Sequence, residues 1–92
     1  MARARVKLIV RGIVQGVLFR ASLSDIARTH HVDGWVRNRA DGGVEAVLEG
    51  EQDDLREVIG WAHRGPSRAR VDSVSVSKPE KPLGLKGFRI TG

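Results

Sequence analysis

Apolar residues recur at every second position near the start of the chain. Val6, Leu8 and Val10 occupy one register, and Lys7 and Arg11 fall in the other. A period of two places one set of side chains on each face of a β-strand, so this segment is predicted to be a half-buried strand. Similar patterns predict further strands at residues 34–39, 44–49, 71–77 and 88–90.

Two other segments repeat their pattern every three to four residues, which is the spacing of one helix face. The positions that share a face are Leu23, Ile26, Ala27 and His30 in the first segment and Leu55, Val58, Ile59 and Ala62 in the second. Gly65 and Pro66 follow the second segment. Glycine and then proline commonly end a helix, because glycine accepts the left-handed turn and proline cannot continue the hydrogen bonding.

Local signals refine the connections between these elements. Asp41-Gly42 between two alternating runs predicts a tight β-hairpin. Val71 lies out of phase with Val74 and Val76, which indicates a bulge or a loop anchor at the start of that strand.

The predicted order is β-α-β-β-α-β with a short extra strand at the C-terminal end. Two β-α-β units with right-handed crossovers that share one sheet place both helices on the same face. The predicted fold class is α+β: a ferredoxin-like α/β sandwich with an antiparallel sheet, in a single domain over residues 1–92. Many unrelated functions use this fold, so the fold does not choose among them.

The composition of the chain excludes several kinds of site and indicates the charge of its partners. The chain has 92 residues and no cysteine, which excludes disulfides, thiolate metal sites and a cysteine nucleophile. Lys and Arg number 16 against 11 Asp and Glu, and this formal net charge of +5 favours anionic partners. No apolar run approaches the ~20 residues that cross a bilayer. We therefore expect a cytoplasmic protein without a membrane partner, and from the small size of the chain we expect a monomer.

The loop between the first predicted strand and helix is a candidate site. It contains Gly12 and Gly16 and leads directly into Arg20. Such a turn points several backbone N–H groups into one hollow at the positive end of the helix, which suits a phosphate. The planar guanidinium of Arg20 can bond two phosphate oxygens at once. An ordinary turn with a surface arginine is the alternative.

Two blocks of the sequence resemble the signatures of the acylphosphatase family. The first block is Gly12-x-Val14-Gln15-Gly16-Val17-x-Phe19-Arg20. The second block is Gly34-Trp35-Val36-Arg37-Asn38-x-x-Asp41-Gly42-x-Val44-Glu45. A weaker third likeness comprises Gly65-Pro66, Ala69-x-Val71 and Gly87-Phe88. The resemblance runs from about residue 6 to the end of the chain, with compatible spacing.

The resemblance implies an enzyme that hydrolyses small-molecule acyl phosphates to a carboxylate and inorganic phosphate, with no metal and no cofactor. It implies that Arg20 binds the phosphate and that Asn38 orients the attacking water. The residues whose backbone is implied to cradle the phosphate are Gly12, Ile13, Val14, Gln15, Gly16, Val17, Leu18 and Phe19. Ile13 and Leu18 differ from the residues usual in the family, which bears on substrate preference and loop rigidity.

Asn38 also stands out without the resemblance. Asparagine is disfavoured inside strands, yet Asn38 is predicted to lie mid-strand, on the same face as Gly34 and Val36. The alternative is an asparagine at a strand end or edge whose amide is satisfied by a neighbouring backbone group.

The chemistry of acyl phosphates suits these residues. Phosphoryl transfer needs positioning and charge stabilisation, which backbone amides and a guanidinium supply. Asparagine cannot act as a base, but it can hold a water in line with the phosphorus. The leaving group is the anion of an acid with a pKa near ~4, so it departs without a general acid. We hypothesise that a phosphate oxygen of the substrate receives the water's proton; a pH profile that follows an enzyme group instead would contradict this.

Metal binding is not expected. His30 and His31 are adjacent on the predicted helix and therefore point apart. No set of Asp, Glu and His in the sequence has the spacing of metal ligands.

The alternative function is an RNA-binding or regulatory ferredoxin-like module without catalysis. RNA-recognition sheets present aromatic side chains on their central strands. This chain has two Phe, two Trp and no Tyr, and its first and third strands offer aliphatic residues and Glu instead, so no nucleic-acid partner is expected. Arg37 and Arg39 share the strand face opposite Asn38, either as a solvated basic face or as a guide for polyanionic substrates.

Overall fold

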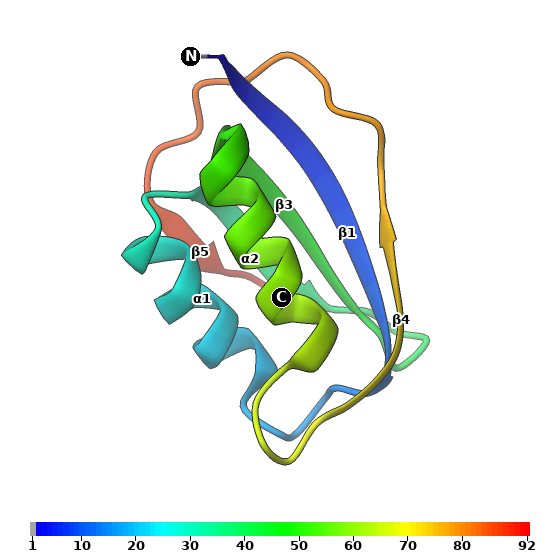
Figure 1. Cartoon of the computed structure of the whole chain (residues 1–92). Coiled ribbons are helices and arrows are strands. Elements are labelled where there is room, and N and C mark those ends of the chain that lie inside the picture. Colours follow the sequence, from blue (N-terminus) through cyan, green and yellow to red (C-terminus); the bar gives the residue numbers. More distant parts are fainter. Residues whose placement is uncertain (1) are drawn as a thin grey trace.

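The chain folds in the order that the apolar pattern predicts. The computed structural model describes residues 2–92, so Met1, which belongs to the predicted domain, lies outside the described residues. The elements are β1 (Arg3–Ile13), α1 (Phe19–Thr29), β2 (Asp33–Asn38), β3 (Val44–Glu51), α2 (Gln52–Arg64), β4 (Arg70–Val76) and β5 (Phe88–Ile90). Figure 1 shows both helices over one face of a single sheet, as the ferredoxin-like prediction requires. Within residues 2–92, no helix is long and apolar enough to cross a membrane.

The sheet has the strand order β4-β1-β3-β2-β5 and is mixed. β1 pairs antiparallel with β3 and β4, and β2 pairs antiparallel with β3. β5, the short extra strand to which the prediction gave no direction, runs parallel to β2, with Phe88 opposite Gly34. The reason is the path of residues 77–87, which pass over the start of β1 to the far edge of the sheet (Figure 1). β5 therefore enters the sheet in the same direction as β2.

The core lies between the sheet and the two helices. Leu8 and Val10 on β1 are fully buried there, as the period of two predicts. The helix residues buried in the same cluster are Phe19, Leu23, Ala27, Leu55, Val58 and Ala62. Each fully buried Val, Leu or Phe side chain of this cluster contributes roughly 1.5–3 kcal/mol through the hydrophobic effect. This contact holds α1 and α2 in fixed positions on the sheet.

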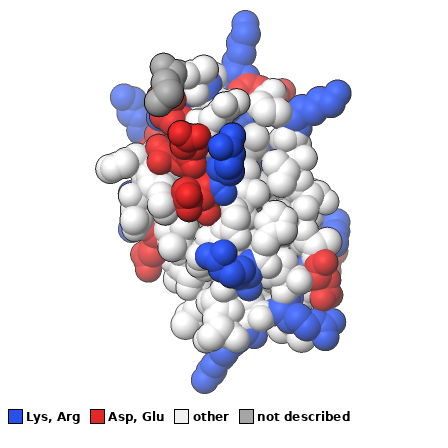
Figure 2. Space-filling model, in the orientation of Figure 1, with Lys and Arg blue, Asp and Glu red and all other residues white. Residues whose placement is uncertain are grey.

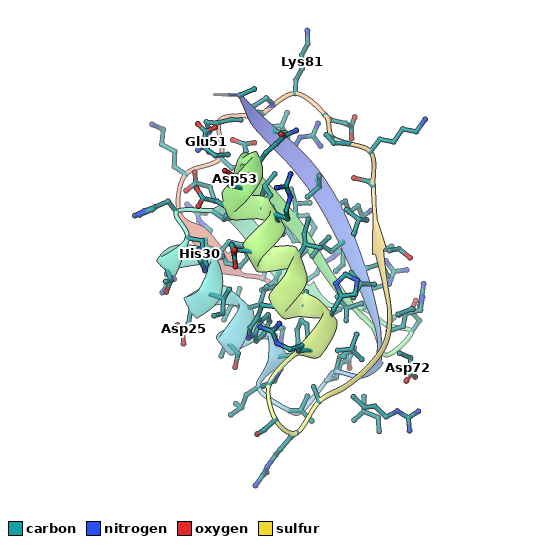
Figure 3. All side chains as sticks on the ribbon, in the orientation of Figure 1. Asp25, His30, Glu51, Asp53, Asp72 and Lys81 are labelled. Atoms are coloured by element: carbon teal, nitrogen blue, oxygen red, sulfur yellow. The ribbon has the colours of Figure 1, made fainter. Side chains whose placement is uncertain are left out.

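The end of α1 differs from the prediction. His30 does not continue the helix face but forms the C-cap, and His31 adopts a left-handed backbone with φ 57°. The N–H of Val32 donates to the carbonyl of Ala27 at 2.8 Å, and the N–H of His31 donates to that of Arg28 at 3.2 Å. This is a Schellman motif with histidine in the position that usually holds glycine. His30, labelled in Figure 3, therefore ends the helix, and His31 already has a different backbone conformation, which the pattern alone did not reveal.

The irregularity predicted at Val71 is confirmed as a β-bulge. Arg11 on β1 pairs with Ser73, and Gly12 pairs with Val71, so Asp72 has no partner on β1. The unpaired residue lies at the outer edge of the molecule (Figure 3). A bulge increases the local twist of a strand pair, and here it lies where β1 leaves the sheet toward α1.

Candidate active site

Gly12, the next-to-last residue of β1, lies at a position where only glycine fits. Its φ of 133° lies outside the range that other residues adopt. A Cβ at this position would also collide with the carbonyl oxygen of Arg70 on β4. The first glycine of the predicted phosphate loop is therefore required by the close approach of two strands.

Two buried side chains anchor the loop. Val14 is 2% exposed and Phe19 is 1% exposed, and both belong to the core cluster. The ring of Phe19 lies 5.3 Å from that of Trp61 on α2, at an interplanar angle of 50°. Between the anchors, Gly16 and Leu18 are exposed. The loop is thus fixed at both ends and open to solvent in the middle.

The middle of the loop has an unusual backbone. Gly16 has φ 73°, and Leu18, the N-cap residue of α1, has φ 65°. Leucine in the left-handed region costs roughly 1–2 kcal/mol. Its side chain is 74% exposed, so burial of this residue does not offset the cost. Turns that combine left- and right-handed residues orient successive N–H groups into an anion-binding concavity.

The N-terminal end of α1 offers free donors to this loop. No side chain caps the helix, and its first turn contains no acidic residue. The first N–H groups of a helix have no intrahelical partner, and the helix dipole makes this end positive. An anion bound in the loop would accept hydrogen bonds from these N–H groups and would be attracted by the positive end of the helix.

Arg20 is the second residue of α1 and is partly buried. The ten ion pairs found within residues 2–92 do not include it. Arg37 and Arg39, in contrast, both pair with acidic side chains. The guanidinium of Arg20 is therefore available to an external anion.

Asn38 is the last residue of β2, so the prediction of a mid-strand position is wrong. Its strand partner is Val44, and the chain turns immediately afterwards. Asn38 lies two residues after the fully buried Val36 and therefore on the same face of the sheet, which is the face that carries the helices. Its Oδ1 is buried and accepts no hydrogen bond within residues 2–92, so the alternative of a neighbouring backbone partner for this oxygen is also wrong. An unsatisfied buried acceptor costs about 1–3 kcal/mol.

The turn that follows Asn38 is tightly held. The carboxylate of Asp41 accepts hydrogen bonds from the backbone N–H of Gly43 at 3.0 Å and from the guanidinium groups of Arg11 and Arg39. These bonds, with that of Gly43 the largest cause, lower the pKa of Asp41 to about 2. The turn therefore keeps its ionised carboxylate at all ordinary pH values.

The side chain of Gln15 joins the loop to this turn. Its Nε2 donates to the carbonyl oxygen of Arg39 at 2.8 Å and to that of Gly43 at 2.9 Å. The family resemblance implied only a backbone role for Gln15. The partners are main-chain carbonyls 24 and 28 residues away, so no local pattern indicates these bonds.

The remaining predicted loop residues take ordinary positions. Ile13 is 54% exposed at the end of β1, and Val17 is partly buried beside the core. Figure 2 shows that acidic side chains gather at the end of the molecule where α2 begins. At the opposite end, where the loop lies in Figure 1, most of the charged side chains on this face are Lys or Arg, among uncharged residues.

Arg37 and Arg39 lie on the sheet face opposite the helices and surround Glu45. Glu45 is only 3% exposed, and it pairs with Lys7 at 2.7 Å, Arg37 at 2.8 Å and Arg39 at 3.5 Å. Lys7 and then Arg37 are the main causes that hold its pKa below the ordinary value of 4.5. The two arginines, Asn38 and Asp41 also line an open hollow of about 380 Å³. The face is a network of paired charges rather than a free basic patch.

Among residues 2–92, no group of three or more His, Asp or Glu is arranged to hold a metal ion. Within residues 2–92, the candidate site therefore offers backbone donors, the guanidinium of Arg20 outside any ion pair, and the carboxamide of Asn38.

The model of the acylphosphatase family matches residues 6–90. An acylphosphatase of Thermococcus kodakarensis is 53% identical over 92 residues, which cover all of both chains. The chain belongs to the acylphosphatase family. It is accordingly a hydrolase that cleaves the carboxyl–phosphate bond of acyl phosphates, which confirms the predicted enzyme class.

Solved structures agree with this membership. The crystal structure of the acylphosphatase from Bacillus subtilis superposes with a TM-score of 0.93 at 33% identity, covering 97% of this chain and 99% of that one. Full-length HypF, crystallised in a phosphate- and nucleotide-bound form, contains a similar region with a TM-score of 0.86 at 28% identity. That match covers 98% of this chain and 12% of HypF.

Proposed function

We propose that the loop of residues 12–19 and Arg20 hold the phosphate of an acyl phosphate and that Asn38 positions the attacking water. The observation that carries this proposal is the unsatisfied Oδ1 of Asn38, buried on the same face of the sheet as α1. A polar atom kept without a partner is expected where a ligand or a water completes the structure.

The loop and Arg20 act on the charge of the transferring phosphoryl group. In this reaction the negative charge is spread over the phosphate oxygens, so the protein contributes mainly fixed donors. The uncapped end of α1 supplies N–H groups that need no reorganisation when the reaction occurs. The fork of Arg20 binds two oxygens together and so also fixes the orientation of the phosphate.

Asn38 acts on the water. Its carboxamide oxygen accepts a hydrogen bond from the water and holds it in line with the bond that breaks, which is an orientation effect. The water attacks phosphorus while the carboxylate departs with the bonding electrons. Because the departing carboxylate is a weak base, the water's proton passes to a phosphate oxygen, and no enzyme acid or base is needed.

We also propose that no metal takes part, because the donors of α1 and Arg20 already supply positive charge where a metal would. Turnover should be unchanged by a chelator and should not rise on addition of magnesium. The predicted monomer and the predicted cytoplasmic location remain predictions, and size-exclusion chromatography with light scattering tests the first.

Hydrolysis of benzoyl phosphate, followed by ultraviolet absorbance in the presence of a chelator, tests the site. Arg20→Ala should raise KM and the inhibition constant of inorganic phosphate. Asn38→Ala should lower kcat by roughly 100-fold or more while it leaves phosphate inhibition nearly unchanged.

Two exposed residues in the N-terminal half of α2 provide matched controls. Arg56→Ala removes an exposed arginine, and Gln52→Ala removes an exposed carboxamide. Both should keep the parent kinetics. A folded Asn38→Ala variant with the parent kcat would refute the role of Asn38, and a folded parent without turnover would refute the catalytic proposal as a whole.

A further inference from the structure

The phosphate loop and Asn38 reach the site from strands that are not neighbours. The loop follows β1, Asn38 ends β2, and β3 lies between these two strands in the sheet. The distance between the phosphate donors and the water-positioning amide is therefore not set by any direct strand pairing. A contact from the loop to the end of β2 is needed to set it.

Gln15 makes that contact. We propose that the Gln15 side chain is a positioning residue that fixes Asn38 relative to the bound phosphate; this inference rests on the proposed function. Its two Nε2 hydrogens reach two different carbonyls, those of Arg39 at 2.8 Å and Gly43 at 2.9 Å. Arg39 follows Asn38 directly in the chain, so the position of its carbonyl sets the direction in which the chain leaves Asn38.

The two acceptors are the carbonyls that close the hairpin. The N–H of Arg39 donates to the carbonyl of Gly43 at 2.8 Å, and the N–H of Gly42 donates to the carbonyl of Arg39 at 3.2 Å. Each carbonyl oxygen has two lone pairs, so it accepts the hairpin bond and the Gln15 bond together. The carboxamide of Gln15 therefore holds the closed form of the turn against the phosphate loop.

Position 15 requires glutamine because its side chain must donate two hydrogen bonds. Both partners are acceptors, so the side chain must present two N–H groups at the length of glutamine. Glutamate has the same shape but only acceptors when ionised, so its oxygens would face two carbonyl oxygens. Methionine fills a similar volume and donates no hydrogen bond.

Loss of the link should affect the chemical step more than phosphate binding. A displacement of about 1 Å from the reactive geometry lowers a rate by roughly 100-fold. Gln15→Met should therefore lower kcat by roughly 10- to 100-fold. The inhibition constant of inorganic phosphate, which reports on the loop and Arg20, should change by less than about 3-fold.

The decisive experiment is a double-mutant cycle between Gln15→Met and Asn38→Ala, measured with benzoyl phosphate. If Gln15 acts through Asn38, adding Gln15→Met to Asn38→Ala should reduce the residual kcat by less than about 2-fold. Gln52→Met, an exposed glutamine on α2, is the matched control and should keep the parent kcat. Gln15→Glu should be at least as slow as Gln15→Met.

Full additivity in the cycle, or a folded Gln15→Met variant with the parent kcat, would overturn the inference. If the parent turns over and Asn38→Ala lowers kcat, such a result refutes the role of Gln15 alone. If Asn38→Ala keeps the parent kcat, the proposed function fails first. If the Gln15 variants do not fold, NMR of the unsubstituted protein decides: both side-chain amide protons of Gln15 must exchange slowly, and free exchange refutes the link.

Discussion

Residues 77–87 reach across the sheet without forming a strand of their own, and one buried carboxylate holds them. Glu49 on β3 is 0% exposed. Its Oε1 accepts the backbone N–H of Leu83 at 2.7 Å, and its Oε2 accepts those of Gly84 at 3.0 Å and Leu85 at 2.9 Å. The substitution Glu49→Gln keeps the shape of this side chain and removes part of its capacity to accept. It therefore tests how much these three bonds contribute.

The expected loss of stability in Glu49→Gln follows from the number of hydrogen bonds that glutamine can keep. With its oxygen in the better position, glutamine keeps two of the three bonds and turns its NH2 group toward the N–H of Leu83. Hydrogen bonds to a charged group contribute about 1.5–3 kcal/mol each and neutral ones about 0.5–1.5 kcal/mol. One bond is lost and two are weakened, while the neutral amide is less costly to bury than the carboxylate. We expect the free energy of unfolding to fall by about 2–4 kcal/mol.

Urea unfolding at neutral pH, followed by tryptophan fluorescence and circular dichroism, measures this change. Glu57→Gln, an exposed glutamate on α2, is the matched control and should lie within about 0.5 kcal/mol of the parent. Trypsin gives a local readout, because Lys86 lies in the segment that Glu49 holds and is not followed by proline. Cleavage after Lys86 should be faster in Glu49→Gln than in Glu57→Gln.

A Glu49→Gln variant with the parent free energy of unfolding and the parent rate of cleavage would refute this reasoning. The segment would then be held by the burial of Phe88 and the pairing of β5 with β2, and the carboxylate would contribute nothing measurable.

Three further predictions concern backbone strain and acid stability. His31→Gly should raise the free energy of unfolding by about 0.5–1 kcal/mol, because φ 57° is free of strain for glycine and the gain exceeds the added entropy of the unfolded chain. Leu18→Gly, at φ 65°, should give a gain of the same sign, and a lower melting temperature in either variant would contradict the assignment of strain. The folded pKa of Glu45 lies below 4.5, so its ionised form contributes stability above that pH, which is lost as the pH falls through the folded pKa. In urea unfolding measured at a series of pH values, Glu45→Gln should reduce the loss of unfolding free energy on the acid side. An unchanged loss would exclude Glu45 as its source.

The local pattern of the sequence determined the elements and much of the core. The period of two in β1 identified Leu8 and Val10 as buried, and the shift of phase at Val71 identified the bulge. These features could be predicted because side-chain direction in a strand depends only on the position along that strand. The two signature blocks likewise indicated the family without any tertiary information.

The pattern did not determine how far each element extends or in which direction it runs. It placed Asn38 inside a strand and His30 on a helix, whereas Asn38 ends β2 and His30 caps α1. It gave no direction for β5, because the direction depends on where residues 77–87 cross the sheet. Such ends and directions are set by contacts between distant parts of the chain.

The bonds of three side chains depended wholly on the tertiary structure. Alternation placed Glu45 and Glu49 on the polar face of β3, yet both are buried, one beneath basic side chains and the other beneath the backbone of residues 83–85. Gln15 likewise finds its partners on a distant hairpin. The type of a polar residue determines which hydrogen bonds it is able to make, but only the folded chain brings a partner to it. For this reason the sequence indicated which residues form the proposed site, and the tertiary structure showed the side-chain contacts that join its parts.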